Sequence, residues 1–162
     1  MTYQLKTLLV DDEAEYDQIL EYVESISPDL TERIELYEDE VPIFDSFEIE
    51  PELEKTLHRK VWMKKGGYIC IDQAEALIAI DVNTGRHRGK GSQEDAILEV
   101  NLEAVEEVAR QMRLRNIGGL VVLDLIDMKS RKHQNSVYKT MKQALKRDRA
   151  RTKILRTSPF GL

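Results

Sequence analysis

The sequence predicts an α/β protein of the layered α+β kind, in which helices pack on a mixed sheet. Short apolar runs of strand length alternate along the chain with longer segments whose apolar residues recur every three or four positions. This alternation of strands and helices is typical of layered domains. The chain has 162 residues, 41% of them hydrophobic, which is enough to form the core of one ordinary domain or two small ones.

In the first part of the chain, the pattern predicts strand, helix, strand and helix. Apolar or alternating runs mark the strands, apolar residues at helical spacing mark the helices, and prolines mark one helix end and one helix start. A glycine pair then interrupts the pattern, so we place a domain boundary between residues 65 and 66. The expected elements are a strand over 5–10, a helix over 13–25 that ends before Pro28, a strand over 33–37 and a helix opened by Pro51.

After this boundary, two apolar runs separated by a short turn predict an antiparallel hairpin. Ser92 is a suitable N-cap, and Asp95 stands three positions later, as in a capping box, so a long helix is expected to begin there. The expected elements are strands over 68–72 and 76–81, a helix from Ser92 to about Arg115, a strand over 120–123, a helix over 132–149 and a closing strand over 152–156.

Charge is distributed unevenly along the chain. The formal net charge is -6, but acidic residues are concentrated in the first third and basic residues in the last third. An evenly spread negative charge would argue against a nucleic-acid partner, because phosphate binding needs local positive potential. The basic last third therefore keeps such a partner open. The alternative explanation for each charge run is a solvated helix face.

We expect a cytoplasmic protein without a membrane span. No apolar run approaches the roughly 20 residues that cross a bilayer, and the first residues lack the basic and then apolar stretches of a secretory signal. The single cysteine, Cys70, lies within an apolar run, so we expect a small core residue there rather than a disulfide partner.

Two aspartates, Asp81 and Asp124, stand where predicted strands end. If these strands are neighbours in one sheet, both carboxylates emerge at the same edge, where they suit a hard cation such as Mg²⁺. Asn83 points to the same side as Asp81 in an extended chain, so its amide can orient a ligand carboxylate. Strand-end aspartates also cap turns and helices, which is the alternative explanation. Asp127 is a rival second carboxylate that we interpret instead as a cap or loop hydrogen-bonder before the last helix.

The loop that follows the first aspartate is basic and rich in glycine. Its glycines let the backbone approach an anion closely, and its cations, Arg86, Arg88 and Lys90, can hold a phosphate. The spacing matches neither a P-loop nor a dinucleotide-binding fingerprint. A flexible solvated loop is the alternative, but together with the aspartates the pattern favours a phosphate substrate.

Several separated motifs together resemble the catalytic region of the bacterial ribonuclease E/G family. The run Ala79-Ile80-Asp81-Val82-Asn83-Thr84-Gly85-Arg86 carries the first aspartate, and Leu123-Asp124-Leu125-Ile126-Asp127-Met128 carries the second. The resemblance covers nearly the whole chain. Further matching stretches lie at 34–37, 42–44, 67–72, 75–78, 101–104, 109–115, 118–122, 133–134 and 148–151.

The resemblance implies an Mg²⁺-dependent endoribonuclease that acts in RNA processing and decay. Such an enzyme cleaves single-stranded RNA and leaves 5′-phosphate and 3′-hydroxyl ends. The matching positions make Asp81 and Asp124 the metal ligands and Asn83 the residue that supports them. Arg151 matches an arginine associated with the pocket that senses the RNA 5′ end.

The resemblance also implies a domain organisation. Residues 66–162 look similar to a deoxyribonuclease I-like subdomain, and residues 1–65 to part of a ribonuclease H-like subdomain. No segment matches the S1 or 5′-sensor domains of the family, and none matches its Cys-rich zinc link, so the chain resembles a catalytic-core fragment. Only 6% of its residues are aromatic, which leaves few positions for stacking bases. Trp62, the single tryptophan, is expected to pack in the domain junction rather than against a base.

Two other functions stay open at this point. The first is a catalytically silent scaffold of the same family that binds RNA or a protein partner, including a second copy of the chain. The second is a phosphatase or a nuclease of DNA that uses the same carboxylate pair. The density of family motifs favours the endoribonuclease.

Overall fold

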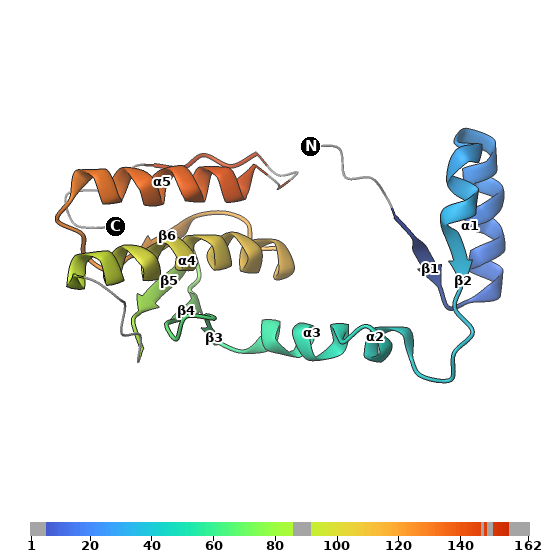
Figure 1. Ribbon diagram of the computed structural model, residues 1–162, viewed down its shortest axis with the longest axis horizontal. Helices are drawn as coiled ribbons and strands as arrows, with labels where there is room; N and C mark the ends of the chain where they lie inside the picture. The colour runs from blue at the N-terminus through green and yellow to red at the C-terminus, as the bar shows by residue number, and fades with distance from the viewer. Residues whose placement is uncertain (1–5, 86–91, 147, 149–150, 156–162) are drawn as a thin grey trace. The chain divides into compact units, whose positions relative to one another are not determined.

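The computed structural model describes residues 6–85, 92–146, 148 and 151–155. The protein consists of helices packed with a mixed sheet, which confirms the predicted fold class (Figure 1). The chain forms two compact units, Met1–Leu53 and Glu54–Leu162. Each unit is described by itself below.

The first unit is a small βαβ arrangement followed by short helices. Strands β1 (Leu8–Val10) and β2 (Ile34–Leu36) pair in parallel, and helix α1 (Glu13–Ile26) connects them through the 3₁₀ helix η1 (Pro28–Arg33). The Asp12 carboxylate caps α1 by accepting a hydrogen bond from the Glu15 amide at 2.9 Å. The predicted order of strand, helix and strand is therefore confirmed. Helix α2 (Ile43–Ser46) follows, and α3 (Ile49–Leu57) begins two residues before Pro51.

The second unit contains a four-stranded sheet in the order β3-β4-β5-β6. Strands β4 (Tyr68–Gln73) and β5 (Ile78–Asn83) form the predicted antiparallel hairpin. Strand β6 (Val121–Asp124) pairs with β5 in parallel, which requires a crossover connection. Helix α4 (Gln93–Leu114) supplies it, and its N-terminus has the predicted capping box of Ser92 and Asp95.

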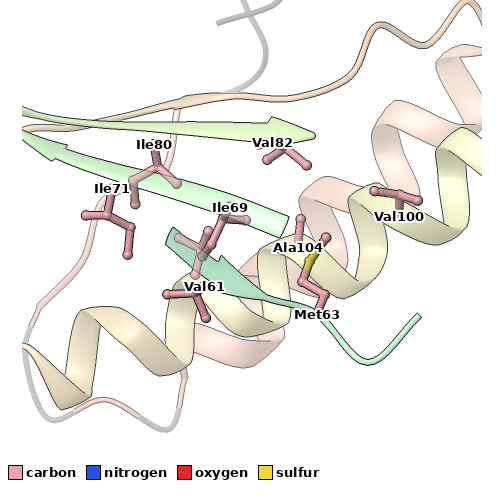
Figure 2. Packing of buried hydrophobic residues seen from close by; sticks show 9 residues of the cluster. Val61, Met63, Ile69, Ile71, Ile80, Val82, Val100 and Ala104 are labelled. Atoms are coloured by element: carbon pink, nitrogen blue, oxygen red, sulfur yellow. The ribbon is translucent and has the colours of Figure 1, made fainter. Parts of the chain in front are cut away.

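The core of this unit lies between the sheet and α4. Side chains alternate between the two faces of a strand, so Ile69, Ile71, Ile80 and Val82 share the face that packs against Val100, Ala104 and Val108 of the helix (Figure 2). Helix α5 (Arg131–Leu145) packs on α4, and its Met141 reaches the same cluster. Cys70 is buried, as predicted, but on the sheet face opposite to this cluster.

Three expectations for the elements need correction. Strand β3 (Lys60–Trp62) was not predicted, because three residues are too few to show a period. The last helix ends at Leu145 rather than at 149. The closing strand predicted over 152–156 is absent from its described part, since residues 152–155 pair with no strand there.

Strand β3 also bears on the domain boundary. It pairs with β4 and belongs to the second unit, and the compact units divide within α3, after Leu53, rather than after residue 65. The similarity of the two parts to ribonuclease H-like and deoxyribonuclease I-like subdomains stays a prediction. In the described part of the chain, no helix is long and apolar enough to cross a membrane.

Candidate active site

Asp81 and Asp124 lie next to each other in the sheet. In the parallel pairing of β5 with β6, Asp81 is the register partner of Asp124. Adjacent strands are about 4.8 Å apart, so the two carboxylates are neighbours on the same face of the sheet, at the edge where β6 ends. Strand β5 runs two residues beyond Asp81, where we expected it to end. Ile80 and Val82 point into the core, whereas the aspartates are exposed. The structure thus confirms that the two strands are neighbours and brings the carboxylates together.

Asn83 is bonded to the first of these carboxylates. Its side-chain amide donates a hydrogen bond from Nδ2 to Oδ2 of Asp81 at 2.6 Å. The two residues are separated by one position in β5 and so share the face of the sheet opposite to α4. The bond occupies one oxygen of Asp81 and fixes the side-chain rotamer, while Oδ1 stays available for another ligand.

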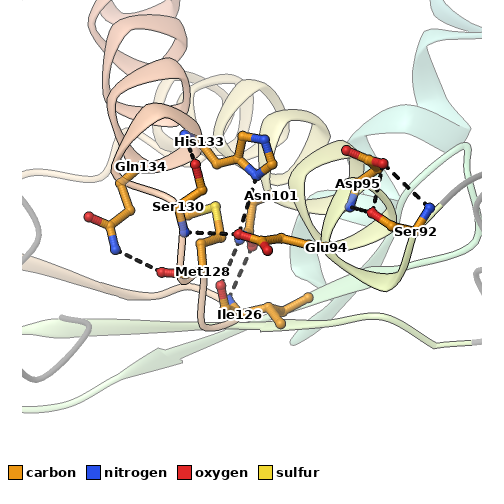
Figure 3. A network of polar contacts seen from close by, with 9 residues as sticks. All are labelled: Ser92, Glu94, Asp95, Asn101, Ile126, Met128, Ser130, His133 and Gln134. Carbon is orange, nitrogen blue, oxygen red and sulfur yellow. Dashed lines mark hydrogen bonds and ion pairs between the residues drawn. The ribbon is translucent and has the colours of Figure 1, made fainter.

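A buried asparagine anchors the chain just after the second aspartate. The Asn101 side chain lies on the buried side of α4 and is 0% exposed, although it is polar. Its Nδ2 donates to the Ile126 carbonyl at 2.7 Å, and its Oδ1 accepts from the Ile126 amide at 3.1 Å (Figure 3). These two hydrogen bonds to the backbone of Ile126 hold the segment that follows β6 against α4. They therefore help to position Asp124, two residues earlier.

A second polar network joins the start of α4 to the start of α5. The Ser130 amide donates to Oε1 of Glu94 at 2.8 Å, and Nδ1 of His133 lies 3.7 Å from the same oxygen (Figure 3). Gln134 closes the network by donating from Nε2 to the Met128 carbonyl at 2.8 Å. The connection between β6 and α5 is therefore held at both of its ends.

Sequence reasoning assigned no role to Asn101, Glu94 or Gln134. The signal for Asn101 was present, because this polar residue stands four positions after Ile97 and four before Val105 in the apolar stripe of α4. Asp127 does not cap α5, because Ser130 is the N-cap and accepts from the His133 amide at 3.4 Å. Asp127 is exposed in the segment between β6 and α5.

The basic loop can be described only at its two ends. Gly85 has a φ of +57°, and a Cβ there would come within 2.3 Å of the Gly66 carbonyl oxygen. Both facts require glycine at this position. At the other end, Oδ2 of Asp95 accepts from the Ser92 hydroxyl at 2.7 Å, which lowers the pKa of the Asp95 carboxyl. The predicted phosphate contacts, Arg86, Arg88 and Lys90, lie outside the described residues.

Arg151 is exposed in an irregular segment after α5. Among the described residues, no hydrogen bond or ion pair joins it to Asp81, Asn83 or Asp124. The structure therefore brings together three of the predicted site residues and leaves Arg151 as a separate prediction.

The third strand-end carboxylate of the sheet has a different partner. Asp72 of β4 forms a two-pronged ion pair with Arg59, in which Nη2 of Arg59 lies 2.7 Å from Oδ2 of Asp72. The hydrogen bonds from Arg59 lower the pKa of the Asp72 carboxyl, and the same pairing raises the pKa of the Arg59 guanidinium. Asp72 pairs in register with Ala79, two residues before Asp81 in β5, so it lies on the same sheet face as Asp81. The charge of Asp81 also contributes to the raised pKa of Arg59, so the Arg59–Asp72 ion pair borders the candidate site.

The described residues contain no cluster of three or more His, Cys, Asp or Glu side chains that could hold a metal ion. A pair of carboxylates does fit Mg²⁺, which keeps several waters and is commonly bound through one or two carboxylates together with substrate phosphate. A soft or tetrahedral metal such as zinc would need more nitrogen or sulfur ligands than this edge offers.

Comparison with known proteins decides the family. The family model described as "Ribonuclease E/G family" matches residues 1–162. The chain belongs to the ribonuclease E/G family. This confirms the resemblance that the motifs around Asp81 and Asp124 carry.

Individual relatives agree with the family model. Ribonuclease G of Salmonella typhimurium is 42% identical over 159 residues, which are 98% of this chain and 32% of that protein. Ribonuclease E of Haemophilus influenzae is 43% identical over 155 residues, 96% of this chain and 17% of that protein. The chloroplastic ribonuclease E/G-like protein of Arabidopsis thaliana is 43% identical over 161 residues, 98% of this chain and 16% of that protein. The chain thus spans about a third or less of the length of these relatives.

Proposed function

We propose that this chain is the catalytic core of an Mg²⁺-dependent endoribonuclease that cleaves single-stranded RNA in cytoplasmic RNA processing and decay. The observation that carries the proposal is the register pairing of Asp81 with Asp124 at one sheet edge. It occurs in a chain whose family relatives are named as ribonucleases.

Asp81 and Asp124 are the residues that would hold the metal. Both offer hard carboxylate oxygens at exposed positions, and the hydrogen bond from Asn83 holds one oxygen of Asp81. Bound there, Mg²⁺ would supply positive charge against the negative charge that develops on the phosphodiester. Without it, two neighbouring carboxylates repel a phosphate.

The proposed reaction adds water across a phosphodiester bond. The water oxygen bonds to phosphorus, the bond from phosphorus to the 3′ oxygen breaks, and a proton goes to that oxygen. One product therefore ends in a 3′-hydroxyl and the other begins with a 5′-phosphate.

The remaining predicted residues bind substrate in this proposal. Arg86, Arg88 and Lys90 hold backbone phosphates beside the carboxylates, and Arg151 contacts RNA nearer to its 5′ end. The exposed lysines and arginines of α5 add positive potential that attracts the RNA. The acidic first third makes no such contribution.

The proposal is tested by cleavage of a 5′-monophosphorylated single-stranded RNA by the 162-residue chain. We expect cleavage that requires Mg²⁺, stops with EDTA and yields 5′-phosphate ends. Asp81→Asn and Asp124→Asn should each lower the rate by more than the roughly 10- to 100-fold that is typical of losing a residue that merely supports a ligand.

Glu106→Gln is the matched control, since it removes an exposed carboxylate from α4 and not from the sheet face that carries Asp81 and Asp124. It should keep the wild-type rate. Undiminished cleavage by Asp81→Asn or Asp124→Asn would sink the proposal. Saturable RNA binding without any Mg²⁺-dependent cleavage would favour the catalytically silent scaffold instead.

A further inference from the structure

The sheet face that carries the carboxylates also carries aromatic side chains. Trp62 pairs in register with Tyr68, and Tyr68 with Asn83, so these three positions form one row across β3, β4 and β5. Lys60 stands in the next row, which continues through Cys70 to Asp81 and Asp124. Residues in the same row of adjacent strands share a face.

Lys60, Trp62 and Tyr68 touch one another, and we call them the aromatic platform. The two ring centroids are 5.1 Å apart with an angle of 59° between the ring planes. The Lys60 ammonium lies 4.2 Å from the Trp62 ring centroid and 3.5 Å from that of Tyr68. Such cation–π contacts hold the rings while the ammonium keeps N–H groups for a further acceptor.

The platform is not part of the core of its unit. Val61 and Met63, the neighbours of Trp62 in sequence, are 9% and 6% exposed, whereas Trp62 is 64% exposed. Within its own unit Trp62 is exposed, and its expected place at a domain junction stays a prediction. Among the described residues, the partners seen for its ring are the other two platform residues.

The position of the platform indicates what it binds. With strands about 4.8 Å apart, Tyr68 lies about 5 Å and Trp62 about 10 Å from Asn83 across the sheet. Asp81 is only two residues further along β5. A ligand whose phosphate reaches the carboxylate edge therefore brings its neighbouring group over the rings.

We propose that the aromatic platform stacks an unpaired base of the RNA whose phosphodiester lies at the Asp81–Asp124 edge. This inference rests on the proposed function for its substrate. Proteins that bind single strands combine aromatic rings, on which bases stack, with cations that contact the backbone, and Lys60 supplies that cation here. Stacking fits any base, so the platform selects unpaired RNA over duplex rather than a particular sequence.

The chain offers a direct probe, because Trp62 is its single tryptophan. The measurement is the intrinsic fluorescence of the 162-residue chain, titrated with a short single-stranded RNA in Ca²⁺, which takes the same oxygen ligands and here replaces Mg²⁺. We expect saturable quenching of the emission. A ribose-phosphate oligomer of equal charge but without bases should quench far less, and so should an RNA duplex.

Affinity measurements with variants complete the test, with labelled RNA followed by anisotropy. Trp62→Leu should weaken RNA binding by about five- to 150-fold, the range measured for losing one stacked base. Trp62→Phe keeps a ring and should stay close to wild type. Tyr22→Leu is the matched control, since Tyr22 is 65% exposed in the first unit, and it should bind normally.

Two results would overturn the proposal that the aromatic platform stacks a base. One is unchanged RNA affinity in Trp62→Leu. The other is a free-state Trp62 emission that is shielded from acrylamide and unaffected by RNA, which would mean that protein covers this face. Either result can be told apart from failure of the proposed function, because cleavage by wild type and its loss in Asp81→Asn are measured separately.

Discussion

At the scale of single residues, one hydrogen bond determines how Asp81 is presented. The Asn83 amide donates a hydrogen bond to Oδ2 at 2.6 Å and leaves Oδ1 without that donor. The amide donates without adding charge, so it orients the carboxylate and does not compete for a cation. Asn83 is thus a positioning residue in our proposal.

Replacing Asn83 should therefore change the metal requirement of cleavage. In Asn83→Ala, we expect the Mg²⁺ concentration for half-maximal cleavage to rise about 10- to 100-fold, because the freed carboxylate samples more rotamers. Asn83→Asp should be worse, since it places a like charge beside Asp81. Thr84→Ala, at an exposed neighbouring position, is the control. An unchanged Mg²⁺ requirement in Asn83→Ala would contradict the positioning role.

The sequence predicts Asp81, Asn83 and Asp124 as candidate site residues, whereas the contacts among them could not be predicted from it. Asp81 and Asp124 each end an apolar run, which is a local signal. Their pairing depends on which strands are neighbours, a property of the whole sheet. The use of Asp72 in an ion pair with Arg59 is also a contact that spacing does not reveal.

At the scale of elements, α4 positions both ends of the site. Its capping box ends the basic loop at Ser92, and its Asn101 holds the backbone that follows Asp124. The helix was predictable because its apolar stripe has a clear period. Strand β3 was not, because its three residues are recognisable only by their pairing with β4.

Asn101→Leu tests the anchoring role of α4. The substitution keeps the volume but leaves both polar groups of Ile126 without their partner, which should lower the free energy of unfolding by about 1–3 kcal/mol for each group that stays buried. Urea unfolding measures this loss. Glu106→Gln, at an exposed position of the same helix, should unfold like the wild type. Equal stability of Asn101→Leu and the wild type would show that the bond to Ile126 is dispensable.

At the scale of the whole molecule, the acidic and the basic parts of the sequence fall in different compact units. The acidic first third makes up most of the Met1–Leu53 unit, and the basic last third belongs to the unit with the sheet and the carboxylate pair. Composition indicated this asymmetry, and the family motifs indicated where the chemistry lies. The division after Leu53 could not be predicted from the sequence. It depends on contacts between elements, such as the pairing of β3 with β4.

The central claim is that a divalent cation binds between Asp81 and Asp124. It is tested most directly by nuclear magnetic resonance of the ¹⁵N-labelled chain with substoichiometric Mn²⁺, which prefers the same oxygen ligands as Mg²⁺ and broadens nearby signals. Our account predicts broadening at the ends of β5 and β6, reversed by excess Mg²⁺ and lost in Asp81→Asn. Broadening only among the acidic residues of the first third, with the signals around Asp81 and Asp124 unaffected, would contradict it.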